Sequence, residues 1–131
     1  MLSGKLPLDF LSEMLGTIDI SDPRVILGPS PGEDAALIEF EGRYLVAKTD
    51  PVTFANDLIG WYVVHVNAND LAVMGAKPLW LMVTLLLPEG IEPSTIRTIF
   101  EQLREACNAM NVSLVGGHTE ITYGLSRPIA I

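Results

Sequence analysis

The sequence has little cysteine, few basic residues and no long apolar run. It contains a single cysteine, Cys107, so no disulfide can form within the chain and no paired-cysteine metal motif is possible. The 8 Lys and Arg residues are scattered among 16 Asp and Glu, which gives a formal net charge of −8. This balance argues against binding nucleic-acid backbones or anionic membranes, because both need clustered positive charge. If the ligand is itself an anion such as a nucleotide, its site needs bridging cations.

Several targeting and catalytic signals are also missing. No apolar stretch approaches the roughly 20 residues that cross a bilayer, and residues 1–10 lack the apolar core of a signal peptide. We therefore expect a cytoplasmic protein. Neither a G-x-x-x-x-G-K-[ST] phosphate loop nor a G-x-S-x-G elbow occurs. What the chain does have is apolar material, 49% of its residues, which suits a single domain spanning residues 1–131 with further surface covered by a partner or a second domain.

Apolar periodicity and turn residues predict alternating helices and strands. Helices are expected at 8–15, from Asn56 or Asp57 to Met74, and after Pro93 as far as Met110. Strands are expected at 35–40 and 44–49 as a hairpin, at 79–87, at 112–115 ending in a glycine pair, and from 128 onward. Residues 21–33, rich in proline and glycine, are expected to form a loop. This order indicates an α+β or mixed α/β domain. The last apolar run stops inside an apparent strand, so we expect a fragment of a longer protein.

Acidic and polar residues stand where the predicted elements begin or end. They are Glu33-Asp34, Thr49-Asp50, Asn69-Asp70 and the stretch GGHTE at 116–120. Asp34 opens one strand of the hairpin and Asp50 closes its partner, so we expect both at the same end of the sheet. Two carboxylates placed there repel each other unless a cation holds them. Mg²⁺ prefers a few carboxylates together with waters and substrate phosphates.

Each of these residues also has an ordinary structural interpretation. Turn positions commonly carry acids next to proline and glycine, a helix can present polar residues to solvent, and a glycine pair after a strand can be a plain turn. On this interpretation the stretch 116–120 carries no ligand, His118 makes a hydrogen bond in a loop, and Cys107 packs in the core. The pattern alone leaves both interpretations open for Glu33, Asp34, Asp50, Asn69, Asp70, Gly116 and Gly117.

Taken together, GEDAALI, KTD, NANDLAVMGAKP and LVGGHTE resemble the N-terminal domain of the aminoimidazole ribonucleotide synthetase (PurM-like) superfamily, over about residues 25–131. The resemblance implies an ATP-binding α+β domain with a four-stranded mixed sheet flanked by helices. Strands of two subunits are expected to form a β-barrel in a homodimer, and a C-terminal domain, absent from this chain, to complete the site. The residues that the resemblance assigns to Mg²⁺ are Asp34, Asp50 and Asp70. Those that it assigns to ATP are Asn69, Gly116, Gly117 and Thr119.

Among the branches of this superfamily, the helix ending AVMGAKP is most similar to the hydrogenase maturation protein HypE. That likeness implies an ATP-dependent dehydration of a carboxamide to a cyano group through phosphoryl transfer, with other hydrogenase maturation proteins as partners. We expect activity from the full-length protein and not from this fragment alone. Two alternatives stay open. One is another superfamily member, a thiamine-monophosphate kinase, a selenophosphate synthetase or a purine-synthesis enzyme. The other is a non-catalytic module for dimerisation or assembly.

Overall fold

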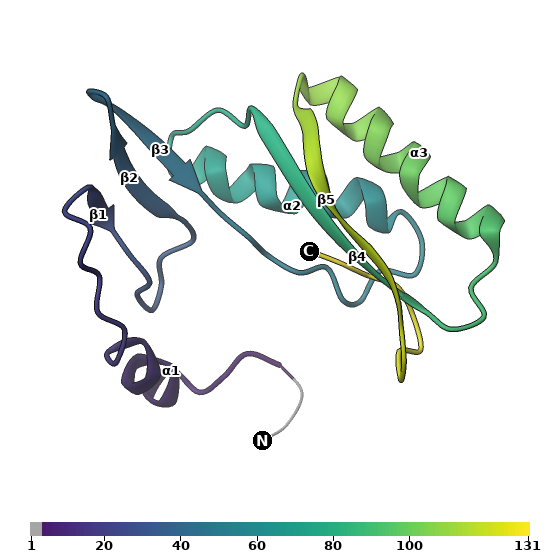
Figure 1. Ribbon diagram of the computed structural model, residues 1–131, viewed down its shortest axis with the longest axis horizontal. Coiled ribbons are helices and arrows are strands. Elements are labelled where there is room, and N and C mark those ends of the chain that lie inside the picture. Colours follow the sequence, from purple (N-terminus) through teal and green to yellow (C-terminus); the bar gives the residue numbers. More distant parts are fainter. Residues whose placement is uncertain (1–3) are drawn as a thin grey trace. The chain divides into compact units, whose positions relative to one another are not determined.

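The structure, a computed structural model, describes residues 4–131 and divides into two compact units between Lys48 and Thr49. The first unit contains α1 (Leu8–Leu15) and an antiparallel sheet of β1 (Val25–Leu27), β2 (Ala36–Phe40) and β3 (Arg43–Ala47), in that order. The second unit contains α2 (Ile59–Val73), β4 (Trp80–Pro88), α3 (Pro93–Met110), β5 (Ser113–Thr122) and β6 (Ile129–Ala130) (Figure 1).

The predicted hairpin is confirmed in the first unit, with a tighter turn than expected. Phe40 pairs with Arg43, so the turn consists of Glu41 and Gly42 alone. Both have positive φ values, 50° and 75°, as a type I′ turn requires. The prediction of an uninterrupted loop at 21–33 is wrong, because β1 lies inside it and pairs with β2. Three apolar residues are too few to show a period, and their pairing with β2 makes them a strand.

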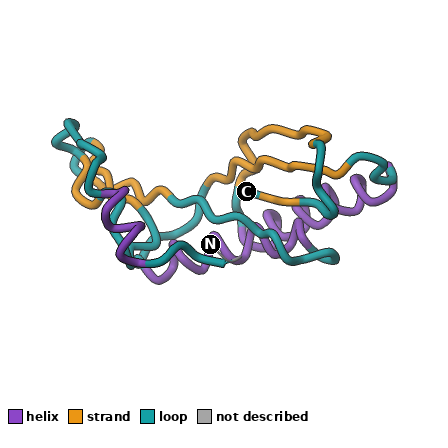
Figure 2. Tube along the Cα trace, turned by 90° about the horizontal axis from the view of Figure 1, so that it is seen from below, coloured by secondary structure: helices purple, strands orange, loops and turns teal. Residues whose placement is uncertain are grey.

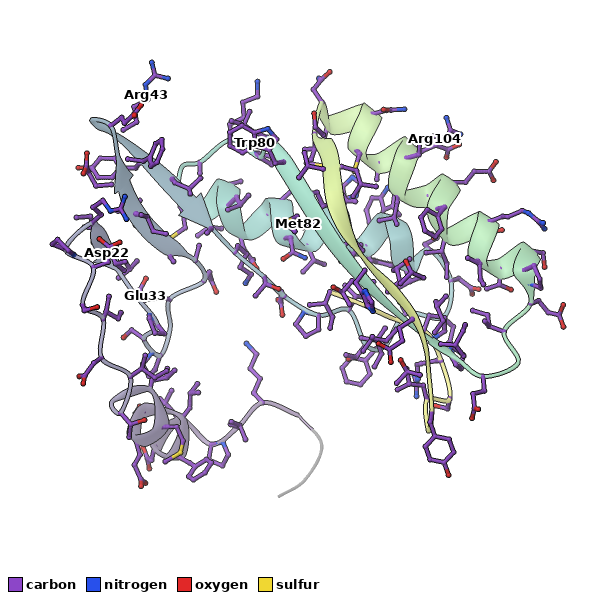
Figure 3. The ribbon with its side chains drawn as sticks, in the orientation of Figure 1. Asp22, Glu33, Arg43, Trp80, Met82 and Arg104 are labelled. Atoms are coloured by element: carbon purple, nitrogen blue, oxygen red, sulfur yellow. The ribbon has the colours of Figure 1, made fainter. Side chains whose placement is uncertain are left out.

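In the second unit, both helices cover one face of a sheet whose strand order is β5-β4-β6 (Figure 2). β4 runs parallel to β5 and antiparallel to β6. Along β4 the buried residues alternate, and Val83, Leu85 and Leu87 join the core with residues of α2 and α3. On the opposite face, Trp80 and Met82 are 63% and 71% exposed (Figure 3). The sheet therefore has one packed face and one bare face in the described chain.

The β-branched segment at 59–73 is helical, as the sequence analysis predicts, but its start is not the one expected. Neither Asn56 nor Asp57 caps α2. The N-cap is Leu58, in the left-handed conformation with φ 57°, and no side chain caps the helix. At the other end, Gly75 has a φ of 73°, which fits the predicted glycine stop. Gly60 lies so close to α3 that a Cβ on it would come 2.5 Å from the Ile99 carbonyl oxygen.

The strand predicted at 112–115 continues well beyond the glycine pair, to Thr122. The register shifts by one residue near Leu81 and Met82, and Gly117 then faces Val83 with a φ of 152°. A Cβ at this position would overlap the Val83 carbonyl oxygen. Gly116 and Gly117 therefore do not end the strand. Gly117 allows it to pass close to β4, which corrects the expectation that the strand ends at the glycine pair.

The α+β class is confirmed, whereas a single four-stranded sheet is not found. Each unit has a sheet of three strands in the described residues. A lone bridge between Val52 and Ala130 places a further stretch of chain beside β6, but it is too short to count as a strand. The dimeric barrel stays a prediction. Across residues 4–131, none of the helices combines the length and hydrophobicity needed to span a bilayer.

Candidate functional site

The backbone around Asp50 is held by hydrogen bonds to two other elements. Two residues further on, the Val52 N–H donates to the Ala130 carbonyl at 2.7 Å, and the Ala130 N–H donates back at 3.2 Å. The carbonyl of Asp50 itself accepts a hydrogen bond of 3.2 Å from the side-chain amide of Asn67. The segment after the hairpin is thus fixed to β6 on one side and to α2 on the other.

Asn67 is the residue that sequence reasoning missed. Among the described residues it is the one polar side chain that is buried, with 8% of its surface exposed. Its Nδ2 also donates to the Val63 carbonyl at 2.9 Å. Its place on α2 explains why: position 67 shares the buried face with Val63 and Val64, but α2 is apolar on nearly every side, so its sequence does not reveal which face is buried. A polar residue at such a position requires a partner.

Asp70 lies three residues after Asn67, one turn further along α2. Residues at this spacing are neighbours on a helix surface, with their Cβ atoms about 5–6 Å apart. Asp70 and Asp50 are both half-buried, whereas Asn69 is exposed to solvent. The structure therefore places two of the three predicted metal ligands in the second unit, each next to Asn67 through either a hydrogen bond or the helix.

Asp34 belongs to the first unit and lies exposed in the loop before β2. The neighbouring Glu33 donates its N–H to the Ser30 carbonyl at 3.2 Å in a turn (Figure 3). This turn fits the ordinary interpretation of the pair. Because Asp34 and Asp50 fall in different units, the expected meeting of their carboxylates stays a prediction.

The stretch from Gly116 to Thr119 lines a cleft of about 420 Å³. Apolar side chains of β4 and α3 form the rest of its wall, among them Val83, Phe100 and Leu103. His118 is on a strand and not in a loop, and its Nε2 lies 3.3 Å from a carboxylate oxygen of Glu120. Both side chains are more than half exposed, so this pair contributes little to stability. The predicted nucleotide residues other than Asn69 thus share one cleft.

Asp22 and Cys107 have shifted pKa values, but neither belongs to the predicted site residues. Arg24 forms a fork with Asp22, with its NH2 atom 2.6 Å from the carboxylate, and this hydrogen bond lowers the pKa of Asp22 to about 2 (Figure 3). Both side chains are exposed in the loop before β1. Burial raises the pKa of the Cys107 thiol, which lies in the core of the second unit as expected. A thiol in such surroundings is inert.

The donor set of the second unit suits a cation that arrives with a phosphate ligand. In the described part of the chain, no group of three or more His, Cys, Asp or Glu side chains is arranged to hold a metal ion. Mg²⁺ does not need such a group, because it is usually bound by one or two carboxylates and keeps waters and substrate phosphates as its other ligands. Asp50 and Asp70 can supply that number of carboxylates.

Comparison with known proteins identifies the family. Residues 32–130 match the family described as AIR synthase related protein, N-terminal domain. The chain belongs to this family. The match covers every residue that we assign to the site, from Asp34 to Thr119. It confirms the PurM-like superfamily that the motifs indicate.

Three curated relatives of this AIR synthase related domain have different activities in their names. A putative hydrogenase expression/formation protein of Methanocaldococcus jannaschii is 29% identical over 93% of this chain, which corresponds to 38% of that protein. The carbamoyl dehydratase HypE of Rhodobacter capsulatus is 39% identical over 67% of the chain, which is 27% of that protein. A thiamine-monophosphate kinase of Aquifex aeolicus is 27% identical over 66% of the chain, which is 31% of the kinase. The chain thus spans well under half the length of these relatives.

Solved structures with the same fold carry the same two names. A structure of AaThiL complexed with AMPPCP and TMP superposes with a TM-score of 0.72 at 25% identity, over 93% of this chain and 38% of that one. A HypE–HypF complex gives a TM-score of 0.69 at 25% identity, over 90% of this chain and 38% of that one. Both likenesses cover nearly the whole AIR synthase related domain.

Proposed function

We propose that this domain is the nucleotide-binding part of an ATP- and Mg²⁺-dependent enzyme of the PurM-like superfamily, of the HypE type. The observation that carries the proposal is that the buried Asn67 binds the backbone of Asp50 and lies one helical turn before Asp70, within a domain whose family match spans all the motifs. A neighbour of the same fold was solved with AMPPCP, which has the phosphate chain of a nucleoside triphosphate. The acidic net charge of the chain fits a site that binds phosphates through metal ions.

The proposed roles follow from the chemistry of the side chains. Asp34, Asp50 and Asp70 bind divalent cations through carboxylate oxygens, as the family resemblance implies. When bound, Mg²⁺ neutralises the negative charge that develops on the phosphates during phosphoryl transfer. Gly116 and Gly117 have no side chains, so the backbone of β5 can approach a ligand closely. Thr119 offers a hydroxyl group from the same strand, and Asn69 offers an exposed amide from α2. These four residues position the nucleotide.

The proposed reaction is the ATP-dependent dehydration of a carboxamide to a cyano group. The γ-phosphoryl group passes to the carboxamide oxygen, and its departure as phosphate, with loss of the amide protons, leaves a carbon–nitrogen triple bond. The HypE-type relatives support this choice. The hydrogenase maturation partners implied by the HypE–HypF complex are part of the same proposal.

A second candidate is a kinase of the thiamine-monophosphate type. The Aquifex aeolicus relative and the AaThiL structure favour it, and they are 27% and 25% identical to this chain. In that case the acceptor is a phosphate oxygen instead of a carboxamide oxygen, and the cation residues keep their roles. Supplying a carboxamide or thiamine monophosphate to the full-length protein, and measuring ADP release with each, distinguishes the two.

Calorimetric titration of the chain with ATP and Mg²⁺ tests the shared part of the proposal. Asp50→Asn and Asp70→Asn each remove a carboxylate that binds the cation, so we expect Mg-ATP affinity to fall about 10-fold or more. Asp57→Asn is the matched control, because it removes the same charge from an exposed acid next to α2 and leaves the cation residues untouched.

An Asp50→Asn chain that binds Mg-ATP as tightly as the wild type would show that the metal assignment is wrong. A full-length wild-type protein that forms dimers but does not bind Mg-ATP would instead favour a non-catalytic assembly module.

A further inference from the structure

Packing alone does not explain why the buried residue at position 67 is an asparagine. An apolar side chain at this position would extend the core formed by Ile59, Val63 and Val64, whereas an amide must recover the hydrogen bonds it loses on leaving water. Its Nδ2 does so with two acceptors, the Val63 carbonyl at 2.9 Å and the Asp50 carbonyl at 3.2 Å. The first bond stays within the helix. The second reaches 17 residues back along the chain.

The bond to Asp50 fixes the backbone from which the aspartate side chain projects. The carbonyl of Asp50 is held by Asn67, and two residues later Val52 is held on both its N–H and its carbonyl by Ala130, which is fully buried. A backbone fixed at both points sets the position of the Cα atom that carries the Asp50 carboxylate. Asp70 is fixed by the same helix that carries Asn67. One amide therefore sets the relative placement of the two carboxylates.

We propose that Asn67 is a positioning residue that holds Asp50 in the orientation in which it shares a divalent cation with Asp70. This inference rests on the proposed function, because it assigns Asn67 to the cation site of that function. Residues that orient metal ligands from outside the coordination sphere typically change metal affinity by about 10- to 100-fold when replaced. Asn67 meets this description through the backbone of Asp50 and not through its carboxylate.

Two substitutions separate the bond to Asp50 from the bond within the helix. Asn67→Ser keeps a hydroxyl that can donate to the Val63 carbonyl four residues earlier, but it is too short to reach Asp50. Asn67→Leu fills the same space and removes both bonds. The matched control is Gln102→Leu, which removes another side-chain bond to the backbone of α2, from the Gly60 N–H to Gln102 Oε1 at 3.1 Å. Gln102 lies on α3, near the start of α2 and away from Asp70.

The measurement is the Mn²⁺ dissociation constant of the full-length protein in the presence of ATP, read from the electron paramagnetic resonance signal of free Mn²⁺. We expect Asn67→Ser and Asn67→Leu to weaken Mn²⁺ binding about 10-fold or more, as Asp50→Asn does. Gln102→Leu should leave it unchanged even where it lowers the urea midpoint of unfolding as much. The side-chain NH₂ signals of Asn67 should also exchange slowly with water in the wild type, without any metal.

The outcomes separate the role of Asn67 from the proposed function. If Asp50→Asn and Asp70→Asn weaken Mn²⁺ binding but neither Asn67 variant does so more than Gln102→Leu, Asn67 is purely structural and the inference is wrong while the proposed function stands. If the wild type binds no Mn²⁺, or binds it independently of Asp50 and Asp70, both the proposed function and the role of Asn67 fall. Fast exchange of the Asn67 amide protons in the wild type would overturn the inference by itself.

Discussion

At the scale of the residue, Gly117 has two possible reasons to be glycine. It belongs to the predicted nucleotide residues, and its backbone passes so close to β4 that a Cβ would overlap the Val83 carbonyl oxygen. Its φ of 152° is also one that residues with side chains rarely adopt. Gly116 has neither restriction, because a Cβ there would meet only the end of the Met82 side chain at 4.0 Å. The sheet therefore requires the second glycine, and any requirement for the first comes from a ligand.

Gly117→Ala should destabilise the chain strongly, by about 3 kcal/mol, because it combines backbone strain with overpacking. Gly116→Ala should change the free energy of unfolding by less than about 1 kcal/mol. Urea unfolding followed by circular dichroism measures both. Equal stability losses for the two variants would show that the register of β5 on β4 is not the one described.

Sequence reasoning found the acidic residues of the site but not the amide that organises them. Asp50 and Asp70 stand out because carboxylates at the ends of apolar elements are costly without a partner. Asn67 does not stand out, since it lies two positions before Asn69 in a segment with several polar residues. Its importance depends on which helix face is buried, and α2 is apolar on nearly every side. The periodicity of α2 therefore could not identify that face.

At the scale of the element, the contact between α2 and α3 depends on Gly60. A Cβ at this position would lie 2.5 Å from the Ile99 carbonyl oxygen and 2.9 Å from the Gln102 Cβ. These distances are shorter than van der Waals contact, and the neighbours are mostly backbone atoms. The two helices can pack at their present separation only with a glycine here.

Gly60→Ala should therefore lower the free energy of unfolding by about 1–3 kcal/mol, the usual cost of overpacking. The sign is informative, because the same substitution in a helix without such a contact raises stability by up to about 1 kcal/mol. Thermal and urea unfolding of this variant give the answer. A stabilised Gly60→Ala protein would contradict the close approach of α2 to α3.

The helix with a strong apolar period, the hairpin and the central strand were predicted correctly, whereas the short strand β1, the start of α2 and the end of β5 were not. The apolar stripe of α3 and its N-terminal Pro93 fix that helix from sequence alone. The start of α2 was misplaced because Leu58 adopts a left-handed conformation that no local pattern indicates for leucine. β5 was cut short because glycines usually end strands. Here the strand continues through Gly117, since its pairing with β4 outweighs the low strand propensity of glycine.

At the scale of the whole molecule, the bare face of the β5-β4-β6 sheet predicts self-association. Trp80 and Met82 are mostly exposed on that face, and every residue of the edge strand β5 from Ser113 to Ile121 is exposed on one face or the other. An apolar sheet face and an exposed edge strand of this length are rarely left in contact with water. We predict that a second copy of the chain covers them, as in the homodimer that the family resemblance implies.

Sedimentation velocity at micromolar concentration should accordingly show a dimer. Met82→Lys should shift it toward monomer, because it places a charge in the covered face. Val73→Lys is the control, since Val73 on α2 is 76% exposed and lies away from this face. A wild-type chain that sediments as a monomer would contradict the predicted dimer.

The claim on which the account depends is that Asp50 and Asp70 bind a divalent cation that carries a triphosphate. The most direct test is to add Mn²⁺ and ATP to the ¹⁵N-labelled chain and follow which amide signals broaden. We predict that the amide signals of Asp50, Val52 and residues 69–72 are lost first, while those of the exposed acidic residues Glu101 and Glu105 on α3 persist. Broadening that spreads evenly over the acidic surface, or that spares Asp50, Val52 and residues 69–72, would contradict it.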